Sequence, residues 1–184
     1  MRLEMKNFFL TLIWLSTTIF CMHAQQRGAF TSVPVVNGNV VFERFIHTDN
    51  TLSADQKYAK LVAWGQSKFV GNPMLTGIRF DDNTRTMTMS LRTNLNLPNG
   101  ETTTMIHRFD ISISNVGSMI VIRDIAYQIT NGDSIFPTTH TAEETITDHA
   151  IAINDENRER RMHTRTATLA FFNELSAEIE ALFR

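Results

Sequence analysis

Four side chains that can bind metal lie close together within residues 140–149. His140, Glu143, Glu144 and His149 carry imidazole and carboxylate groups, which are ligands of zinc and iron. Their spacing differs from that of known ligand sets such as the His-Glu-x-x-His pair on one helix turn. We therefore interpret them as solvated loop residues, and we expect neither a metal site nor a cofactor.

A histidine and two aspartates are candidates for acid–base chemistry. His107 has the strand parity of apolar neighbours, which predicts a partly buried, hydrogen-bonded residue at the margin of a sheet. Asp110 and Asp124 are expected on facing strands and could form a carboxylate pair like that of glycoside hydrolases. The interpretation that we favour is that both aspartates are solvated or paired with Arg108 and Arg123.

The cleanest pattern in the chain is an alternation of polar and apolar residues over 86–97. Odd positions carry Met87, Met89 and Leu91, whereas even positions carry hydroxyl, amide and guanidinium groups. The alternation predicts a strand with one buried and one wet face. A polar sheet face can bind a glycan, a peptide or a protein, or it can be plain solvated surface. The candidate binding residues are Thr86, Thr88, Ser90, Arg92, Asn94, Arg108 and Asp110.

No catalytic motif accompanies these residues. The sequence contains no Gly-x-Ser-x-Gly elbow, phosphate loop or dinucleotide fingerprint. We therefore predict a non-catalytic binding module whose partner is an envelope protein, a peptide or a glycan, and no catalytic residues. Two alternatives remain: a hydrolase of envelope or glycan material, and a structural envelope protein.

The elements that must position these residues follow from periodicity. Alternation predicts strands over 40–46, 78–80, 87–97, 101–113 and 119–129, the last with Val121 on the same side as Ile125 and Tyr127. Ser53 and Gln56 form a capping-box pattern that opens a helix ending at 71–73. No period holds over 133–153, which predicts a long loop. A final helix, capped by Asn154 or Asp155, carries an apolar stripe from Met162 to Phe183.

The order of elements predicts the fold class. Turns of hairpin length make the last four strands antiparallel neighbours. Because both helices must bury an apolar stripe and the sheet has a single apolar face, both should pack on that face. We therefore predict a two-layer α+β domain, with an antiparallel five-stranded sheet, two helices on one face and the order β-α-β-β-β-β-α.

The first residues have the features of a secretory signal peptide. Arg2 and Lys6 precede an apolar run over 8–15, and Ala24 supplies a small residue at the cut. We predict a signal peptide over 1–24, a lead-in over 25–38 and a single domain over 39–184. The mature chain would begin at Gln25 in the periplasm or cell envelope. Lipidation at Cys21, the one cysteine, is the less favoured alternative because the bulky Phe20 precedes it.

Composition excludes some partner classes. The chain carries 17 basic and 19 acidic side chains, and removing the leader leaves an acidic excess. A dense basic patch, which binding to nucleic acid requires, is missing from the sequence. The apolar run of the leader is shorter than the ~20 residues that span a bilayer. We therefore expect neither a nucleic-acid partner nor an integral membrane span.

Three segments carry a family resemblance. They are residues 35–42, Val-Val-Asn-Gly-Asn-Val-Val-Phe; residues 58–64 of the first helix; and the hairpin from Phe109 to Ile125. Together with the leader, they resemble an exported family of Bacteroidota proteins of unknown function with a TATA-binding-protein-like fold. The resemblance covers about residues 35–183, although the hairpin turn Asn115–Ser118 departs from the more basic turn typical of the family. It implies the fold derived above and no activity.

Overall fold

The computed structural model of the 184-residue chain describes residues 28–48, 51–129, 137–153 and 155–184. The predicted leader over 1–24, its cleavage before Gln25 and the alternative at Cys21 lie outside these residues. Among the described helices, none is long and apolar enough to cross a membrane.

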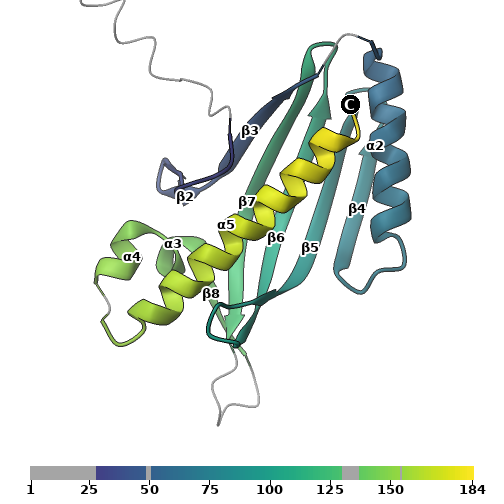
Figure 1. Cartoon of the computed structure of the whole chain (residues 1–184). Helices are drawn as coiled ribbons and strands as arrows, with labels where there is room; N and C mark the ends of the chain where they lie inside the picture. Colours follow the sequence, from purple (N-terminus) through teal and green to yellow (C-terminus); the bar gives the residue numbers. More distant parts are fainter. Residues whose placement is uncertain (1–27, 49–50, 130–136, 154) are drawn as a thin grey trace, which may run out of the picture.

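The body of the protein is an antiparallel sheet of five main strands in the order β3–β7–β6–β5–β4 (Figure 1). This arrangement confirms the predicted sheet. A short strand, β8, pairs with the end of β7, and two-residue strands β1 and β2 form a separate hairpin. The bounds are β1 Val35–Val36, β2 Asn39–Val40, β3 Phe42–His47, β4 Leu75–Asp81, β5 Thr86–Asn96, β6 Thr102–Ile113, β7 Gly117–Ile129 and β8 Thr138–Thr141.

The alternation predicted for β5 is present in the structure. Met87, Met89 and Leu91 are fully buried, whereas the even positions are half-buried or exposed. On β6, Phe109 and Ile111 extend the same buried surface. One face of the sheet therefore forms the core, since each large apolar side chain that leaves water contributes ~2 kcal/mol.

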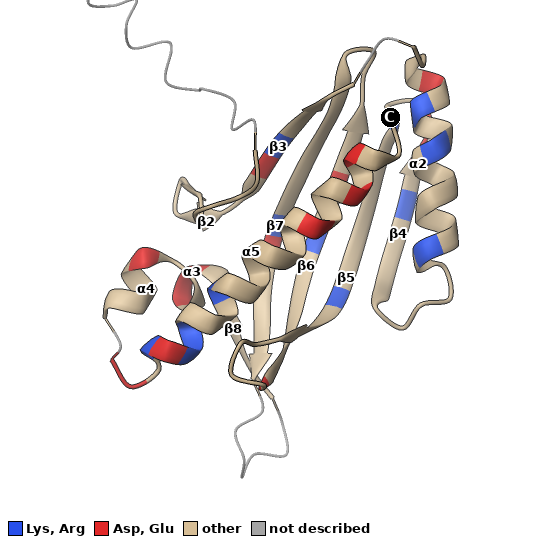
Figure 2. Ribbon diagram, in the orientation of Figure 1, with Lys and Arg blue, Asp and Glu red and all other residues tan. Residues whose placement is uncertain are grey.

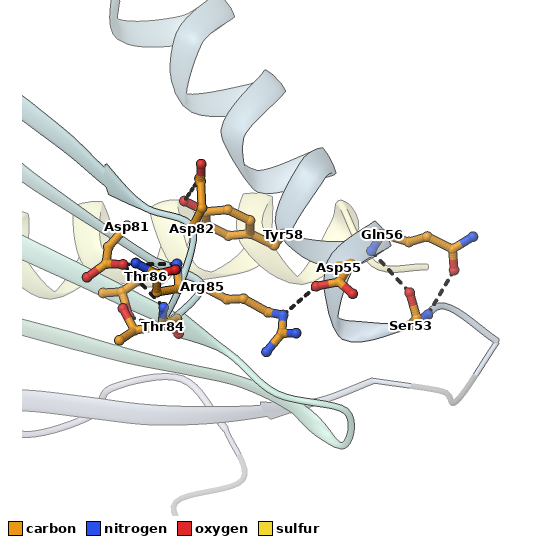
Figure 3. Close-up of polar contacts among 10 residues, drawn as sticks. Ser53, Asp55, Gln56, Tyr58, Asp81, Asp82, Thr84, Arg85 and Thr86 are labelled. Atoms are coloured by element: carbon orange, nitrogen blue, oxygen red, sulfur yellow. Dashed lines mark hydrogen bonds and ion pairs between the residues drawn. The ribbon is translucent and has the colours of Figure 1, made fainter.

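Helix α2 (Ala54–Phe69) covers one part of the apolar face. Ser53 and Gln56 form the predicted capping box, with N–H···O distances of 3.2 and 2.8 Å (Figure 3). Leu61 is fully buried, and a Cβ added at Gly65 would lie 2.6 Å from the Met87 sulfur. The helix thus approaches β5 closely at a residue with no side chain.

Helix α5 (Arg158–Ala181) crosses the same face, so both long helices lie on one side of the sheet as predicted (Figure 1). Phe172 and Ile179 are fully buried. The helix begins later than expected, with Asn157 as its N-cap. Asp155 lies one turn earlier, where its carbonyl accepts the Arg158 N–H at 3.4 Å. The prediction of Asp155 as the cap is therefore wrong, and Asn154 lies outside the described residues.

Charges join the two helices to each other and to the sheet edge. Figure 2 shows basic positions along α2 and acidic positions in the C-terminal half of α5. Lys68 of α2 pairs with Glu178 of α5, and Arg44 of β3 pairs with Glu180 at 3.0 Å. These pairs are partly solvated, so each contributes at most ~1 kcal/mol. Their main effect is to orient the helices on the apolar face.

A β-bulge in β7 overturns the predicted pattern of that strand. Ile106 faces Ala126 but Arg108 faces Arg123, so β7 has one extra residue, and Asp124 has a positive φ of 54°. The bulge reverses the alternation. Ile120 and Ile122 are buried before it, Ile125 and Tyr127 after it, and Val121 lies on the other face.

Short elements occupy the described part of 133–153, where a loop was expected. They are β8, α3 (Ala142–Thr145) and α4 (Asp148–Ala152), both helices capped by threonine hydroxyls. Helices of 4 and 5 residues complete barely a turn, so no hydrophobic period can appear in their sequence. The expectation of a structureless loop is wrong there, and residues 133–136 lie outside the description.

His107 lies deeper than the sequence indicated. Its side chain is 1% exposed, with ring centroids of Phe171 and Phe172 at 5.7 and 5.4 Å. Neither ring nitrogen has a hydrogen-bond partner among the described residues. The prediction of a hydrogen-bonded residue at the sheet margin is therefore wrong. Burial lowers the pKa of this imidazole from 6.5 to about 3, because the charged form loses its hydration.

The close approach of β3 and β7 gives a first prediction. A Cβ at Gly117 would lie 2.2 Å from the Ile46 carbonyl oxygen, a backbone atom that cannot rotate away. We expect Gly117→Ala to lower the free energy of unfolding by ~1–3 kcal/mol, as overpacking typically does. Urea unfolding measures the effect. Gly77→Ala is the matched control, because no atom lies within 4 Å of its added Cβ; an equal loss in the control would contradict the prediction.

His107 gives a second prediction, about pH. Its folded-state pKa is about 3, below the ordinary value of 6.5. Between these values the unfolded chain binds a proton that the folded protein excludes, so this residue lowers stability as pH falls. The limiting slope is ~1.4 kcal/mol per pH unit. We expect His107→Leu to remove this contribution of His107 to the loss of stability between pH 6 and pH 4. Urea unfolding at each pH measures the free energy of unfolding. If this free energy changed equally for wild type and variant between pH 6 and pH 4, the prediction would be contradicted.

Candidate functional site

The face of the sheet opposite the helices is the candidate site, and we call it the open face. None of the described helices lies on it (Figure 1). The β5 side chains on this face are half-buried or exposed, whereas the side chains that alternate with them are buried. The predicted residues all lie on this face, on the adjacent strands β5 and β6: Thr86, Thr88, Ser90, Arg92, Asn94, Arg108 and Asp110.

Strand register brings these residues into rows across the sheet. Thr88 faces Asp110, Ser90 faces Arg108, and Asn94 faces Thr104. The hydroxyl of Thr104 bonds the Asn94 amide oxygen at 2.9 Å. Side chains directly opposite one another in a sheet are close enough to interact, and the Thr88–Asp110 and Asn94–Thr104 rows are joined by side-chain hydrogen bonds.

The centre of the open face is a charged network around Asp110. One carboxylate oxygen accepts a hydrogen bond from the Thr88 hydroxyl at 2.7 Å, and the other accepts one from Nε of Arg123 at 3.0 Å. Nε of Arg108 lies 3.5 Å from the first oxygen. Arg123 also contacts Asp124 at 3.3 Å. The predicted pairing of both aspartates with these arginines is therefore confirmed, and Asp110 is held in one orientation.

The predicted binding residues left out Arg123 and Gln128, which both lie on β7 and belong to this face. Arg123 sits directly opposite Arg108, and the Gln128 amide oxygen accepts a hydrogen bond from Arg92. A strict alternation had assigned the parity of Arg123 to the core along with Val121. An arginine in an otherwise apolar row was the signal that could have revealed the bulge.

A cavity of about 470 Å³ adjoins the network at the bulge. Arg123 and Asp124 line it on one side, and Val40 and Val41 on another. Glu143 closes part of it, because its carboxylate accepts the Val40 N–H at 2.5 Å. The open face therefore continues into a hollow between β7, the β1–β2 hairpin and α3.

The four histidine and glutamate residues of segment 140–149 lie apart and have separate roles. Glu143 accepts a hydrogen bond from the backbone of β2, and Glu144 completes the capping box of α3. His149 lies in α4, and His140 lies on β8. Across the described residues, no three histidine, cysteine or acidic side chains gather where they could hold a metal ion.

A second polar cluster joins the start of α2 to the β4–β5 turn (Figure 3). Asp55 pairs with Arg85 at 2.6 Å, and the Tyr58 hydroxyl donates to Asp82 at 2.9 Å. Burial, assisted by Asp82, raises the pKa of Tyr58 to about 12. The hydroxyl therefore stays protonated at neutral pH and serves as a hydrogen-bond donor. This cluster fastens α2 to the sheet and presents no unpaired reactive group.

Two crystal structures are similar to this protein. A TBP-like protein from Parabacteroides distasonis aligns with a TM-score of 0.73 at 19% identity, over 82% of this chain and 96% of that chain. A DUF4468 family protein from Bacteroides ovatus aligns with a TM-score of 0.66 at 19% identity, over 86% of this chain and 94% of that chain. Likeness at such identity shows the fold alone.

At the level of sequence, no family model matches this chain and no curated protein matches it significantly. The structural matches confirm the resemblance to Bacteroidota proteins of unknown function. They also confirm the α+β class with an antiparallel sheet of five main strands. The protein thus has the TATA-binding-protein-like fold, and its activity must be argued from its own residues.

Proposed function

We propose that the protein is an exported, non-catalytic binding module that holds a partner on the open face of its sheet. The observation that carries the proposal is the network around Asp110, in which four side chains from three strands hold one another in place. Because these side chains are already held in place, they lose little conformational entropy when a ligand binds, and this favours binding. Export rests on the signal-peptide pattern of residues 1–24.

Two features favour binding over hydrolysis. His107, the candidate general base, is buried in the core and faces two phenylalanine rings. Both carboxylate oxygens of Asp110 accept hydrogen bonds, one from Thr88 and one from Arg123. A general acid or base needs an oxygen directed at the substrate. The partner classes that suit the face are an envelope protein, a peptide or a glycan.

Charge and bulk placed on the open face provide the direct test. We expect the double variant Thr88→Glu, Asn94→Glu to abolish capture of the envelope partners that the wild-type chain, beginning at Gln25, retains. Thr166→Glu is the matched control, because Thr166 is exposed on α5 on the opposite side of the sheet. Captured partners must also bind the purified protein saturably. Equal recovery by wild type and the double variant would refute the proposal.

A double-mutant cycle tests the fixed orientation of Asp110. We expect Asp110→Asn and Arg123→Gln each to lower the free energy of unfolding, because each leaves one partner of a half-buried pair without its counterpart. The combined variant should lose less than the sum of the single losses, with a coupling of ~1 kcal/mol. Chemical denaturation measures all four proteins, and strictly additive losses would show that the network does not act as a unit.

A further inference from the structure

Three arginines lie together at the middle of the open face, and we call them the arginine triad: Arg92, Arg108 and Arg123. Arg108 and Arg123 are direct cross-strand partners. Arg92 faces Ile106 on β6, which places it diagonally from Arg108 at the ~7–8 Å spacing that long side chains can bridge. The triad therefore spans three neighbouring strands on one face.

The triad carries more positive charge than its surroundings neutralise. Among the described residues, Asp110 is shared by Arg108 and Arg123, and Asp124 pairs with Arg123. Arg92 bonds an uncharged amide, that of Gln128. Two of the three guanidinium groups thus have ion pairs, with two carboxylates between them, and Arg92 has none among the described residues. The triad therefore carries one positive charge more than its acidic partners, which leaves room for one more negative charge.

Like charges directly opposite one another repel, and between Arg108 and Arg123 the shared carboxylate of Asp110 offsets that repulsion. Nε of Arg108 is buried without a hydrogen bond among the described residues, and its ion pair with Asp110 is long, at 3.5 Å. A guanidinium group has five N–H donors in a planar fork that matches a carboxylate. Arg108 therefore has both the unused donors and the geometry to take a further carboxylate.

The neighbours of the triad define the ligand. Asp110 and Asp124 would repel a polyanion such as nucleic acid but tolerate a single carboxylate. The cross-strand neighbours Ser90, Ile106 and Ala126 offer no aromatic ring on which a sugar or base could stack. An acidic side chain within an extended polypeptide satisfies both conditions.

We infer that the arginine triad binds a glutamate or aspartate side chain of a partner protein, in an extended segment laid across the open face. This inference rests on the proposed function and names its ligand chemistry.

Matched peptides test the inference. The probes are a short threonine-rich peptide with a single central glutamate, its glutamine and lysine counterparts, polygalacturonate and a single-stranded oligonucleotide, each titrated into the full mature chain. We expect the glutamate peptide to bind at least ~10-fold more tightly than the glutamine peptide, a difference of ~1.4 kcal/mol. Added salt should weaken it. Absent or equal binding of the glutamate peptide, or preference for polygalacturonate or the oligonucleotide, would overturn the inference.

Variants assign the effect to the triad. Arg123→Gln should weaken binding of the glutamate peptide ~10-fold. Arg158→Gln makes the same charge change at an exposed residue of α5 and should not alter this binding. Arg92 is exposed, so Arg92→Glu should fold and shift the preference toward the lysine peptide. An unchanged preference in folded Arg92→Glu would also overturn the inference.

The two proposals fail separately. If Thr88→Glu, Asn94→Glu abolishes partner capture while Arg92→Glu leaves the peptide preference unchanged, the open face binds by another chemistry and only the triad inference fails. If the double variant recovers the same partners as wild type, the open face is not the binding surface and the proposed function fails.

Discussion

The structure depends on a sheet with one apolar face. Burial of Met87, Met89, Leu91, Phe109 and Ile111 is the main stabilising term of this layer, and it requires a cover that excludes water. Helices α2 and α5 provide that cover, and both lie on the same side (Figure 1), because the fully buried apolar positions of β5 and β6 share one face and their open-face positions are mostly polar. The open face is therefore a consequence of how the core forms.

The bulge at Asp124 is a local departure with effects on both faces. The extra residue lets Ile120 and Ile122 pack before the bulge and Ile125 and Tyr127 after it, so the whole strand contributes to the core. The same shift places Arg123 on the open face opposite Arg108. One residue with a positive φ thus links core packing to the charged network that we propose as a binding surface.

Elements whose stabilisation is local or strictly periodic could be predicted. The β5 alternation and the capping box at Ser53 depend on residues within one strand or one helical turn, and both are confirmed. Two features that depend on distant residues or on very short elements were predicted wrongly. The environment of His107 comes from Phe171 and Phe172, more than sixty residues away in the chain. The helices within 142–152 are too short to show a period.

The sequence by itself determined the α+β class, the five main strands, the two long helices and the polar character of the residues opposite the core. These follow from hydrophobic periodicity, which acts over a few residues. The tertiary structure alone decided that three arginines share one face. Strand order and the bulge bring Arg92, Arg108 and Arg123 together from three strands, because cross-strand pairing depends on register and an inserted residue changes register without altering composition.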